Sequence, residues 1–390
     1  MKPNSKSDTI YQSKQNTVLT PETKSSPKKT IPVWKGPDID GITFSLLSRF
    51  LQCRERFRLR TVYGYKEEIG FEPKMEYGSM WHEGEEAVAA HGDWRQAIKA
   101  YSNKLLETYG GSEEQIHNWT SICLTQFQIY VNHYSKDRSL KTRTPLLEEV
   151  SFKVPILLPS GRSVFLRGKF DCVFLQKSSA SSKSPTIWLQ ENKTKGEIDE
   201  EGIGATLQMN LQAMIYQVAL RQLARYSEET ISKYQSNHPQ FCDSLQQYAQ
   251  NKMKIEGTLY NVVRRPLSDR YAIRQKKSET TRQFHSRLGE EIQANPKKYF
   301  LQWKAVISEK KIEEFQTKVL YPLLEQLCDW WEWIKVDPDN PWRLGNIHHF
   351  QYPWGTYHSL AGGFRGDFFN HLTKGTTRGM YVEKELFPEL

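Results

Sequence analysis

Three β-rich runs follow one another in the middle of the chain, and a long helical run comes directly after them. The β-rich runs are LLEEVSFKVPILL from Leu146, SVFLRGKFDCVFL from Ser163 and TIWLQENK from Thr186. Residues that favour turns separate the first two runs at Pro159–Gly161, and a Ser/Lys loop over 176–185 separates the second from the third. Such short links predict an antiparallel meander. The helical run over Gly204–Arg225 and a β-rich run over Ile255–Val263 predict a further strand in the same sheet.

Helical periodicity dominates the chain before and after these strands. Thr43 is a candidate helix cap, and apolar residues recur after it at helical spacing as far as Val62. Further helices are expected over the ranges Gly78–Ala90, Asp93–Tyr109, Ser112–Tyr134, Glu279–Ala294 and Ser308–Lys335. The sequence therefore predicts an α/β fold in which a central mixed β-sheet is flanked by helices, with a helical N-terminal layer and a helical C-terminal extension.

Composition divides the chain into three parts. Residues 1–38 are rich in Ser, Thr, Lys and Pro with hardly any apolar pattern, which predicts a disordered basic arm. The predicted helices and strands make residues 39–336 the folded domain. The aromatic-rich segment over 337–390 matches no regular pattern, and we expect it to pack on the folded domain as a tail.

The overall composition limits the class of protein. A mean hydropathy of −0.68 and the lack of a long apolar run exclude a membrane span, and the N-terminus lacks the apolar core of a signal peptide. The five cysteines are scattered without a C-x-x-C pair, so we expect reduced thiols in a cytoplasm rather than disulfides or a tetrathiolate zinc site. A formal charge of +9 favours a polyanionic partner such as nucleic acid.

Two carboxylates and a lysine stand at the ends of the second and third β-rich runs. Asp171 closes one run, and Glu191 and Lys193 close the next on a shared face of the strand. Carboxylates so placed can hold one or two hard divalent cations, and a lysine beside them can position water and offset phosphate charge. The acid–any–lysine triplet occurs four times in the chain: Glu22/Lys24, Glu72/Lys74, Glu191/Lys193 and Glu309/Lys311. Only the third follows a strand that ends in an acid, which favours a site over a solvated pair of charges.

Three more polar residues accompany this pattern. His82 lies on a helix four residues after Gly78, whose missing side chain permits close backbone approach, and a neutral imidazole can complete an oxygen-rich metal shell. Gln212 and Tyr216 are one turn apart on the helix after the third strand. Each has an ordinary alternative: a helical histidine is often packed or solvated, and a Gln–Tyr pair often belongs to an amphipathic face.

The order of these elements resembles the PD-(D/E)XK nuclease superfamily, and within it the RecB-like exonuclease branch with its phage-type members. The resemblance begins with TFSLLSRFLQCRERFRLRTVYGY and passes through G-x-x-x-H at Gly78–His82, G-x-x-D at Gly168–Asp171 and E-x-K at Glu191–Lys193. It ends with Q-x-x-x-Y at Gln212–Tyr216 and covers roughly residues 43–300. By this resemblance the core would be restriction-endonuclease-like.

The resemblance also implies a role for each site residue. Asp171, Glu191 and Lys193 would be catalytic. One or two Mg²⁺ or Mn²⁺ ions would be held by His82, Asp171, Glu191 and the backbone carbonyl of Asn192. Gln212 and Tyr216 would help to place the DNA.

One departure from some relatives concerns an iron–sulfur cluster. Such relatives place one cysteine near the N-terminus and three near the C-terminus; here Cys53 matches the first loosely, but residues 337–390 contain no cysteine. A cluster needs four thiolates apart from rarer histidine substitutions, so no iron–sulfur cluster is expected. His348, His349 and His358 are more in keeping with aromatic packing than with a zinc site.

A basic run with aromatic residues in it follows the last β-rich run. It begins at Arg264 and Arg265, continues to Arg287, and is interleaved with Tyr260, Tyr271 and Phe284. It suits a groove that tracks a DNA backbone and stacks unpaired bases, and it equally suits a solvated helix face.

The sequence thus predicts a metal-dependent DNA nuclease, in the first place an exonuclease of recombination, repair or phage DNA metabolism that acts on single strands or DNA ends. A helicase or recombinase is a candidate partner, since no Walker motif is present. The alternatives are a DNA-binding or assembly protein that keeps the fold without catalysis, and a structure-specific endonuclease.

Overall fold

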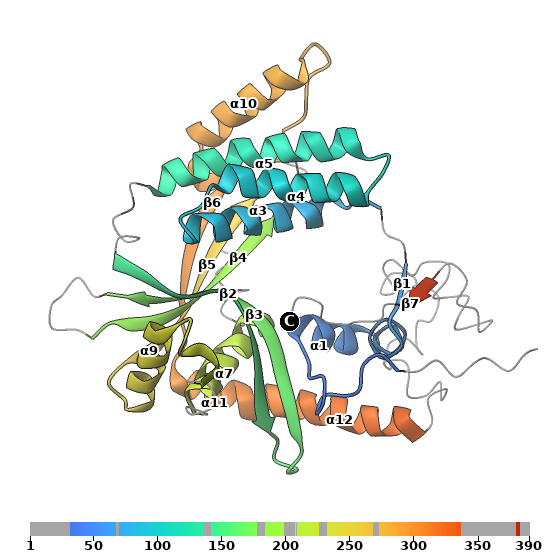
Figure 1. The fold of residues 1–390 in the computed structure, drawn as a ribbon, viewed down its shortest axis with the longest axis vertical. Helices are drawn as coiled ribbons and strands as arrows, with labels where there is room; N and C mark the ends of the chain where they lie inside the picture. Colours follow the sequence, from blue (N-terminus) through green and yellow to red (C-terminus); the bar gives the residue numbers. More distant parts are fainter. Residues whose placement is uncertain are drawn as a thin grey trace, which may run out of the picture. The chain divides into compact units, whose positions relative to one another are not determined.

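A five-stranded mixed sheet forms the centre of the protein (Figure 1). The computed structural model describes residues 32–67, 70–135, 137, 142–177, 184–198, 207, 209–225, 232–267, 273–336 and 380–382. In spatial order the strands are β2 (Arg143–Leu157), β3 (Ser163–Gln176), β4 (Thr186–Lys195), β5 (Lys254–Arg264) and β6 (Phe300–Val306). The first three form an antiparallel meander, β5 runs parallel to β4, and β6 runs antiparallel to β5. The predicted mixed sheet and meander are therefore confirmed, while β6 was not predicted.

Helices cover both faces of this sheet (Figure 1). One layer consists of α3 (Pro73–Ala89), α4 (Trp94–Thr108), α5 (Glu113–Tyr134) and α10 (Thr281–Ala294). The other side carries α1 (Phe44–Gln52), α2 (Arg54–Phe57), the π-helix η1 (Arg58–Val62), α7 (Leu211–Arg225), α9 (Pro239–Ala249), α11 (Glu309–Phe315), the π-helix η4 (Gln316–Leu320) and α12 (Tyr321–Val336). A short 3₁₀ helix, η3 (Pro296–Lys298), precedes β6. None of the helices in the described part of the chain has the length and apolar character that a membrane span requires.

Each layer has its own apolar core. Tyr77 and Trp81 of α3 and Phe127 of α5 are fully buried. They pack with residues of α4 and α10, with the end of β5 and with the start of β6. On the other face, α7 is buried along nearly its whole length against β2, β3 and α9. The helical patterns found in the sequence arise because each helix turns one face to one of these cores.

Several element boundaries differ from those expected. Thr43 does cap α1, since its hydroxyl accepts a hydrogen bond from the Leu46 backbone, but that helix ends at Gln52 rather than running on to Val62. Helix α3 begins five residues early, at Pro73, because proline fits the first helical position, where no N–H is needed. Helix α7 begins at Leu211 among the described residues, later than Gly204.

The ordered chain also begins earlier than residue 39. Trp34 lies within the segment 1–38 that was expected to be disordered, yet its indole is fully buried, packs against Phe57 and Trp331, and donates to the carbonyl of Gly41. The boundary of the predicted arm at residue 38 is therefore wrong, because a single large aromatic residue anchors the segment. Residues 1–31 lie outside the described residues.

A second, two-stranded sheet joins distant parts of the sequence. Strand β1 (Tyr65–Glu67) pairs antiparallel with β7 (Met380–Val382). The remainder of the predicted tail, residues 337–379 and 383–390, lies outside the described residues.

Candidate active site

The central sheet forks partway along β3 and β4, so Asp171 and Glu191 lie within their strands and not at the strand ends expected from the sequence. The two strands are paired only from Cys172/Gln190 to Gln176/Thr186. Before Cys172, β3 continues beside β2, and after Gln190, β4 continues beside β5. Asp171 and Glu191 are the first residues beyond the last shared pair, so the fork brings together two acids that are 20 positions apart in the sequence.

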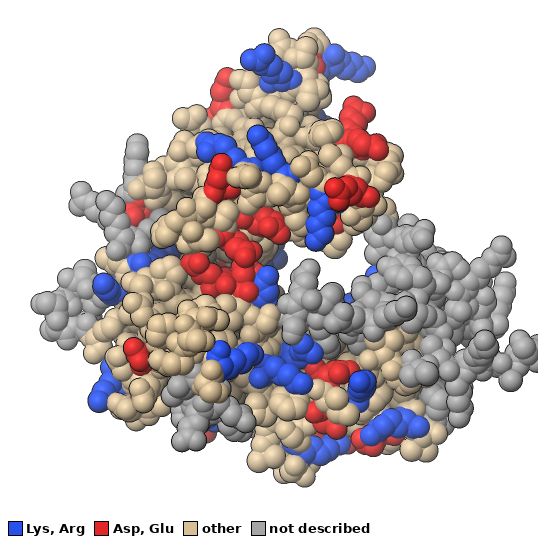
Figure 2. Space-filling model, in the orientation of Figure 1, with Lys and Arg blue, Asp and Glu red and all other residues tan. Residues whose placement is uncertain are grey.

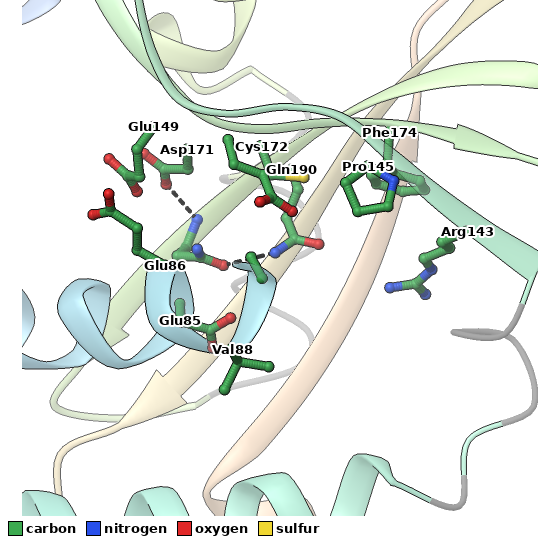
Figure 3. A pocket seen from close by; sticks show the side chains of 13 residues that line it. Glu85, Glu86, Val88, Arg143, Pro145, Glu149, Asp171, Cys172, Phe174 and Gln190 are labelled. Carbon is green, nitrogen blue, oxygen red and sulfur yellow. Dashed lines mark hydrogen bonds between the residues drawn. The ribbon is translucent and has the colours of Figure 1, made fainter. Parts of the chain in front are cut away.

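Asp171 is held across this fork by a hydrogen bond to the neighbouring strand. The backbone N–H of Asn192 donates to Asp171 Oδ2 over 2.7 Å (Figure 3). The carboxylate thus accepts the N–H hydrogen bond that a backbone carbonyl of β3 would accept if the pairing of β3 with β4 continued. The expected metal-binding role of the Asn192 carbonyl stays a prediction.

Strand β2 deviates from regular geometry opposite Asp171. The pairs Glu148/Cys172 and Val150/Phe170 place Glu149 opposite Asp171, but these two residues are not themselves paired. Glu149 has a φ of 50°, the left-handed region that costs a residue with a side chain about 1–2 kcal/mol. This irregularity brings a third carboxylate to the fork, one that sequence reasoning missed.

His82, Glu149 and Asp171 form a compact group of potential metal ligands. One ligand atom from each residue lies within 4.8 Å of the corresponding atoms of the other two. Burial disfavours the charged form of His82, but its contact with Glu149 and the charges of Glu149 and Asp171 outweigh burial and raise the pKa of His82. Burial alone would raise the pKa of Glu149, yet contacts with His82 and with Lys169 Nζ, 2.7 Å away, hold that pKa below its usual value.

Glu191 is the most deeply buried acid of the site. Its side chain is 0% exposed, Oε2 accepts from Lys193 Nζ over 2.7 Å, and Oε1 has no hydrogen-bond partner among the described residues. Burial, together with the nearby charge of Asp171, raises the pKa of Glu191 to about 7. A buried carboxylate oxygen left unsatisfied costs stability and needs an explanation, and a cation ligand at this position would provide one.

The residues present fit a divalent cation. Burial also raises the pKa of Asp171, so two of the acids are held in conditions that disfavour their negative charge. Carboxylate oxygens with one imidazole nitrogen are ligands that Mg²⁺ and Mn²⁺ accept. The unsatisfied Glu191 Oε1 and the cluster of His82, Glu149 and Asp171 are what such a site requires before an ion is bound.

Lys193 is oriented by two acceptors. Besides Glu191, its Nζ donates to Gln212 Oε1 of α7 over 2.8 Å. The E-x-K triplet and the Q-x-x-x-Y helix, recognised separately in the sequence, therefore meet in space. Their contact fixes the direction of the ammonium group.

Tyr216, in contrast, supports the site through its packing in the apolar core. Its ring is 7% exposed and packs edge-on against Phe152 and Phe170, which stack on each other. Gly168 leaves room for this arrangement, because a Cβ there would lie 2.7 Å from Phe152 and 2.9 Å from Tyr216. A ring enclosed in this way has little face free for stacking on a base. The contribution of Tyr216 to DNA placement stays a prediction.

Helix α3 packs against the face of the sheet opposite to α7. Gly78 allows this approach, since a Cβ there would lie 3.1 Å from Thr194 Oγ1 of β4. One turn beyond His82, the partly buried Glu85 accepts hydrogen bonds from Trp81 and from Asn261 of β5, and Asn261 also donates to Asn192. This polar network fixes the helix that carries His82 relative to β4 and β5.

A pocket of about 230 Å³ lies between α3 and the sheet beside the carboxylates (Figure 3). Its wall contains an acidic group made up of Glu85, Glu86, Glu148, Glu149 and Asp171. Arg143 and Phe174 line its other end, with the guanidinium 5.2 Å from the ring centre. In Figure 2 the acidic side chains gather in a hollow between the α3–α5 layer and the β2–β3 region.

Three residues that were expected to bind DNA, Tyr260, Arg264 and Arg265, do not line this pocket and make contacts within the fold. Tyr260 is fully buried and its hydroxyl donates to the carbonyl of Leu207, so its ring cannot stack on a base in this conformation. Arg264 is 9% exposed, with its guanidinium bonded to the Gly196 carbonyl and 5.2 Å from the Tyr299 ring. Arg265 is half-buried and donates to Thr194. Both arginines brace the end of β4 after Lys193.

A cluster of carboxylates and an imidazole beside an oriented lysine provides the groups that metal-assisted cleavage of a phosphodiester requires. A model of the PD-(D/E)XK nuclease superfamily matches residues 42–330, most of the chain. The chain belongs to this superfamily, which makes metal-dependent nuclease activity its family function. No curated protein matches the chain.

Proposed function

We propose that this protein is a Mg²⁺- or Mn²⁺-dependent deoxyribonuclease of the RecB-like branch that degrades DNA from an end. The observation that carries the proposal is the fork between β3 and β4, where Asp171, Glu191 and Lys193 meet and Glu191 Oε1 lacks a partner among the described residues. The order of the sequence motifs supports the branch, and with it action on ends in recombination, repair or phage DNA metabolism. Any unwinding would come from a partner such as a helicase.

In this proposal the residues divide into ion-binding and positioning groups. His82, Glu149, Asp171 and Glu191 hold the ion. A divalent cation at such a site activates water and offsets the charge of the phosphate. Lys193, directed by Gln212, aligns the water or the phosphate with its ammonium group.

The domain organisation extends the proposal. Pairing of Met380–Val382 with Tyr65–Glu67 supports the view that residues 337–390 pack on the nuclease domain as a tail. The same pairing would tie the tail to the segment between η1 and α3.

The test uses the full chain on end-labelled linear DNA and covalently closed circular DNA, each single- and double-stranded, with Mg²⁺, with Mn²⁺ and with chelator. We expect metal-dependent degradation that is faster on linear than on circular substrates. Equal rates on closed circular and linear DNA would decide for an endonuclease. Binding without cleavage in either metal would decide for a non-catalytic DNA-binding protein.

Matched variants separate the site from general effects on the fold. Asp171→Asn and Glu191→Gln should abolish cleavage while DNA binding remains. Lys74→Ala is the control, because Lys74 belongs to another acid–any–lysine triplet but is exposed at the start of α3. Full activity in Glu191→Gln would show that the fork is not the catalytic site.

A further inference from the structure

A row of basic side chains leads along the β2–β3 hairpin to the carboxylates. The register pairs Lys153 with Arg167 and Ser151 with Lys169, and the next position on this face is Glu149 opposite Asp171. Between them, Phe152 and Gly168 point to the buried side. Successive rows on one face are about 7 Å apart, so basic groups stand one and two rows from the metal cluster.

The hairpin keeps these cations on its accessible face. Lys153 is exposed and Arg167 is half-buried. Lys153 Nζ donates to the carbonyl of Ile39 and Arg167 Nη1 donates to that of Asp40. Both acceptors are neutral carbonyls. Burial lowers the pKa of Arg167, and the charge of the Asp40 carboxylate opposes that change. Figure 2 shows lysine and arginine side chains gathered over the β2–β3 region directly beside the acidic hollow.

Further positive charge lies at the same place. The residue after Lys233, Tyr234, donates from its hydroxyl to the Ser151 carbonyl of β2 over 3.1 Å, which brings this segment to the hairpin. Burial and the charge of Arg167 lower the pKa of Lys233. Like charges that repel one another in this way favour an anionic ligand that bridges them.

The chain segment before α1 fixes the edge of this surface. Residues 37–42 run beside β3, where Phe165 and Arg167 exchange backbone hydrogen bonds with Pro37 and Ile42. The free edge of β3 below the fork is thereby covered. The outer face of the hairpin remains the accessible surface that continues into the site.

We propose that Lys153 and Arg167 hold phosphates of the substrate strand on one side of the scissile one, two rows of the sheet away from the metal cluster. The outer face of the β2–β3 hairpin is then the track along which a DNA strand reaches that cluster. This inference rests on the proposed nuclease function and adds the path of the substrate. An extended polyanion is the ligand that matches it, because only a chain of phosphates can meet successive basic rows and then present one phosphate to a cation held by carboxylates.

The test removes charge but keeps a hydrogen-bond donor at each position. The double variant Lys153→Gln/Arg167→Gln is compared with Lys252→Gln/Lys254→Gln, two exposed lysines at the opposite end of the sheet, where Lys254 is level with Thr186. Binding of a fluorescent single-stranded 20-mer with nuclease-resistant phosphorothioate linkages is followed by anisotropy between about 0.05 and 1 M salt. Thermal melting of each variant confirms that it is folded.

The size of the effect follows from counterion release. Each phosphate contact on a single strand contributes about 0.7 to the slope of log K against log salt, so loss of two contacts should lower the slope by about 1.4 and weaken binding about 25-fold at 0.1 M salt. The control should match the wild type. Unchanged affinity and slope in Lys153→Gln/Arg167→Gln would overturn the inference.

Two further measurements distinguish the track from the nuclease activity. On a strand with neutral methylphosphonate linkages, wild type and double variant should bind equally, and a persistent difference would argue against phosphate contacts. Hydrolysis of a p-nitrophenyl ester of thymidine 5′-phosphate, which has no flanking phosphate, should be unaffected in the double variant. If the wild type fails to hydrolyse any diester but the double variant still loses binding, the track stands and the proposed catalysis fails.

Discussion

Replacement of Glu191 by glutamine tests whether the site contains a buried carboxylate whose charge is balanced only when a cation binds. In chelator-treated protein, Glu191 is a fully buried carboxylate with one unsatisfied oxygen, and its only hydrogen-bond partner among the described residues is Lys193. A glutamine side chain at this position would have nearly the same shape and no charge. We therefore expect Glu191→Gln to make the metal-free protein more stable at alkaline pH, although it should abolish cleavage.

The magnitude follows from the pKa of Glu191, which burial raises from 4.5 to about 7. At 1.36 kcal/mol per pKa unit, the charged form destabilises the fold by about 3 kcal/mol above pH 7. A raised carboxyl pKa means that the folded state binds the proton more tightly, so stability falls as the pH rises from about 4.5 through about 7. The raised pKa of His82 acts in the same direction above its ordinary value, whereas the lowered pKa of Glu149 acts only below pH 4.5.

The assay is thermal unfolding in chelator at pH 5 and pH 8. With an unfolding entropy of about 2.1 cal/mol/K per residue over roughly 300 folded residues, 3 kcal/mol corresponds to a Tm difference of roughly 5 °C. Glu191→Gln should melt higher than the wild type by this amount at pH 8 and by only about a quarter of it at pH 5, where the folded carboxyl is still protonated. Added Mg²⁺ should raise the Tm of the wild type at pH 8 more than that of the variant. A variant that melts at or below the wild type at pH 8 in chelator would refute the buried-charge argument.

Two other substitutions probe separate parts of the site. Lys193→Met should lower the cleavage rate at least about 100-fold while Mg²⁺ still raises the Tm, because the lysine positions reactants without binding the ion; loss of both effects would show that it is needed for metal binding. Gly168→Ala should lower the stability by about 1–3 kcal/mol, since the new methyl group would overlap the Phe152 and Tyr216 rings; an unchanged melting temperature would show that these rings are free to move.

The sequence predicted those parts of the fold in which burial alternates regularly. In β3, even-numbered residues from Val164 to Phe170 are buried and odd-numbered ones are partly exposed, so the apolar pattern is visible in one dimension. Strand β6 lacks such a pattern, because it pairs only with β5 and only Phe300 and Ala305 are buried. The sequence FLQWKAV alone does not distinguish this strand from a loop, because its pairing with β5 defines it as a strand.

The ionisable residues of the site differ in how well they could be predicted. Asp171, Glu191 and Lys193 interrupt apolar β-rich runs, which a local pattern can reveal, although Asp171 and Glu191 lie within β3 and β4 and not at the ends of these strands. Glu149 belongs to an acidic pair between Leu147 and Val150, a pattern that resembles a solvated stretch. Its interruption of the apolar alternation was the available signal, but its meaning depends on the left-handed turn that brings it opposite Asp171.

The DNA-binding role expected of residues on β5 stays a prediction, but the burial of these residues was not visible in the sequence. Tyr260 and Arg264 have the composition of a nucleic-acid groove, but β5 is a central strand with helices over both faces and is buried almost throughout. A central strand reads as a near-continuous apolar run, and sequence gives no sign of which polar residues in it are enclosed. The basic row on the outer face of β2 and β3 escaped notice because Lys153 and Arg167 are 14 positions apart and become neighbours only through the hairpin.

The fork in the sheet explains why function and strain occur at one place. Where β3 and β4 separate, a backbone donor loses its strand partner and is satisfied by Asp171, and Glu191 is left buried with one oxygen unsatisfied by any described residue. Glu149 adds a left-handed residue at the same level. A regular sheet would have none of these three destabilising features. In a chain selected for stability alone, substitutions that remove them would be favoured. Their coincidence around one cluster of ligands is the pattern expected where binding of a cation offsets the strain.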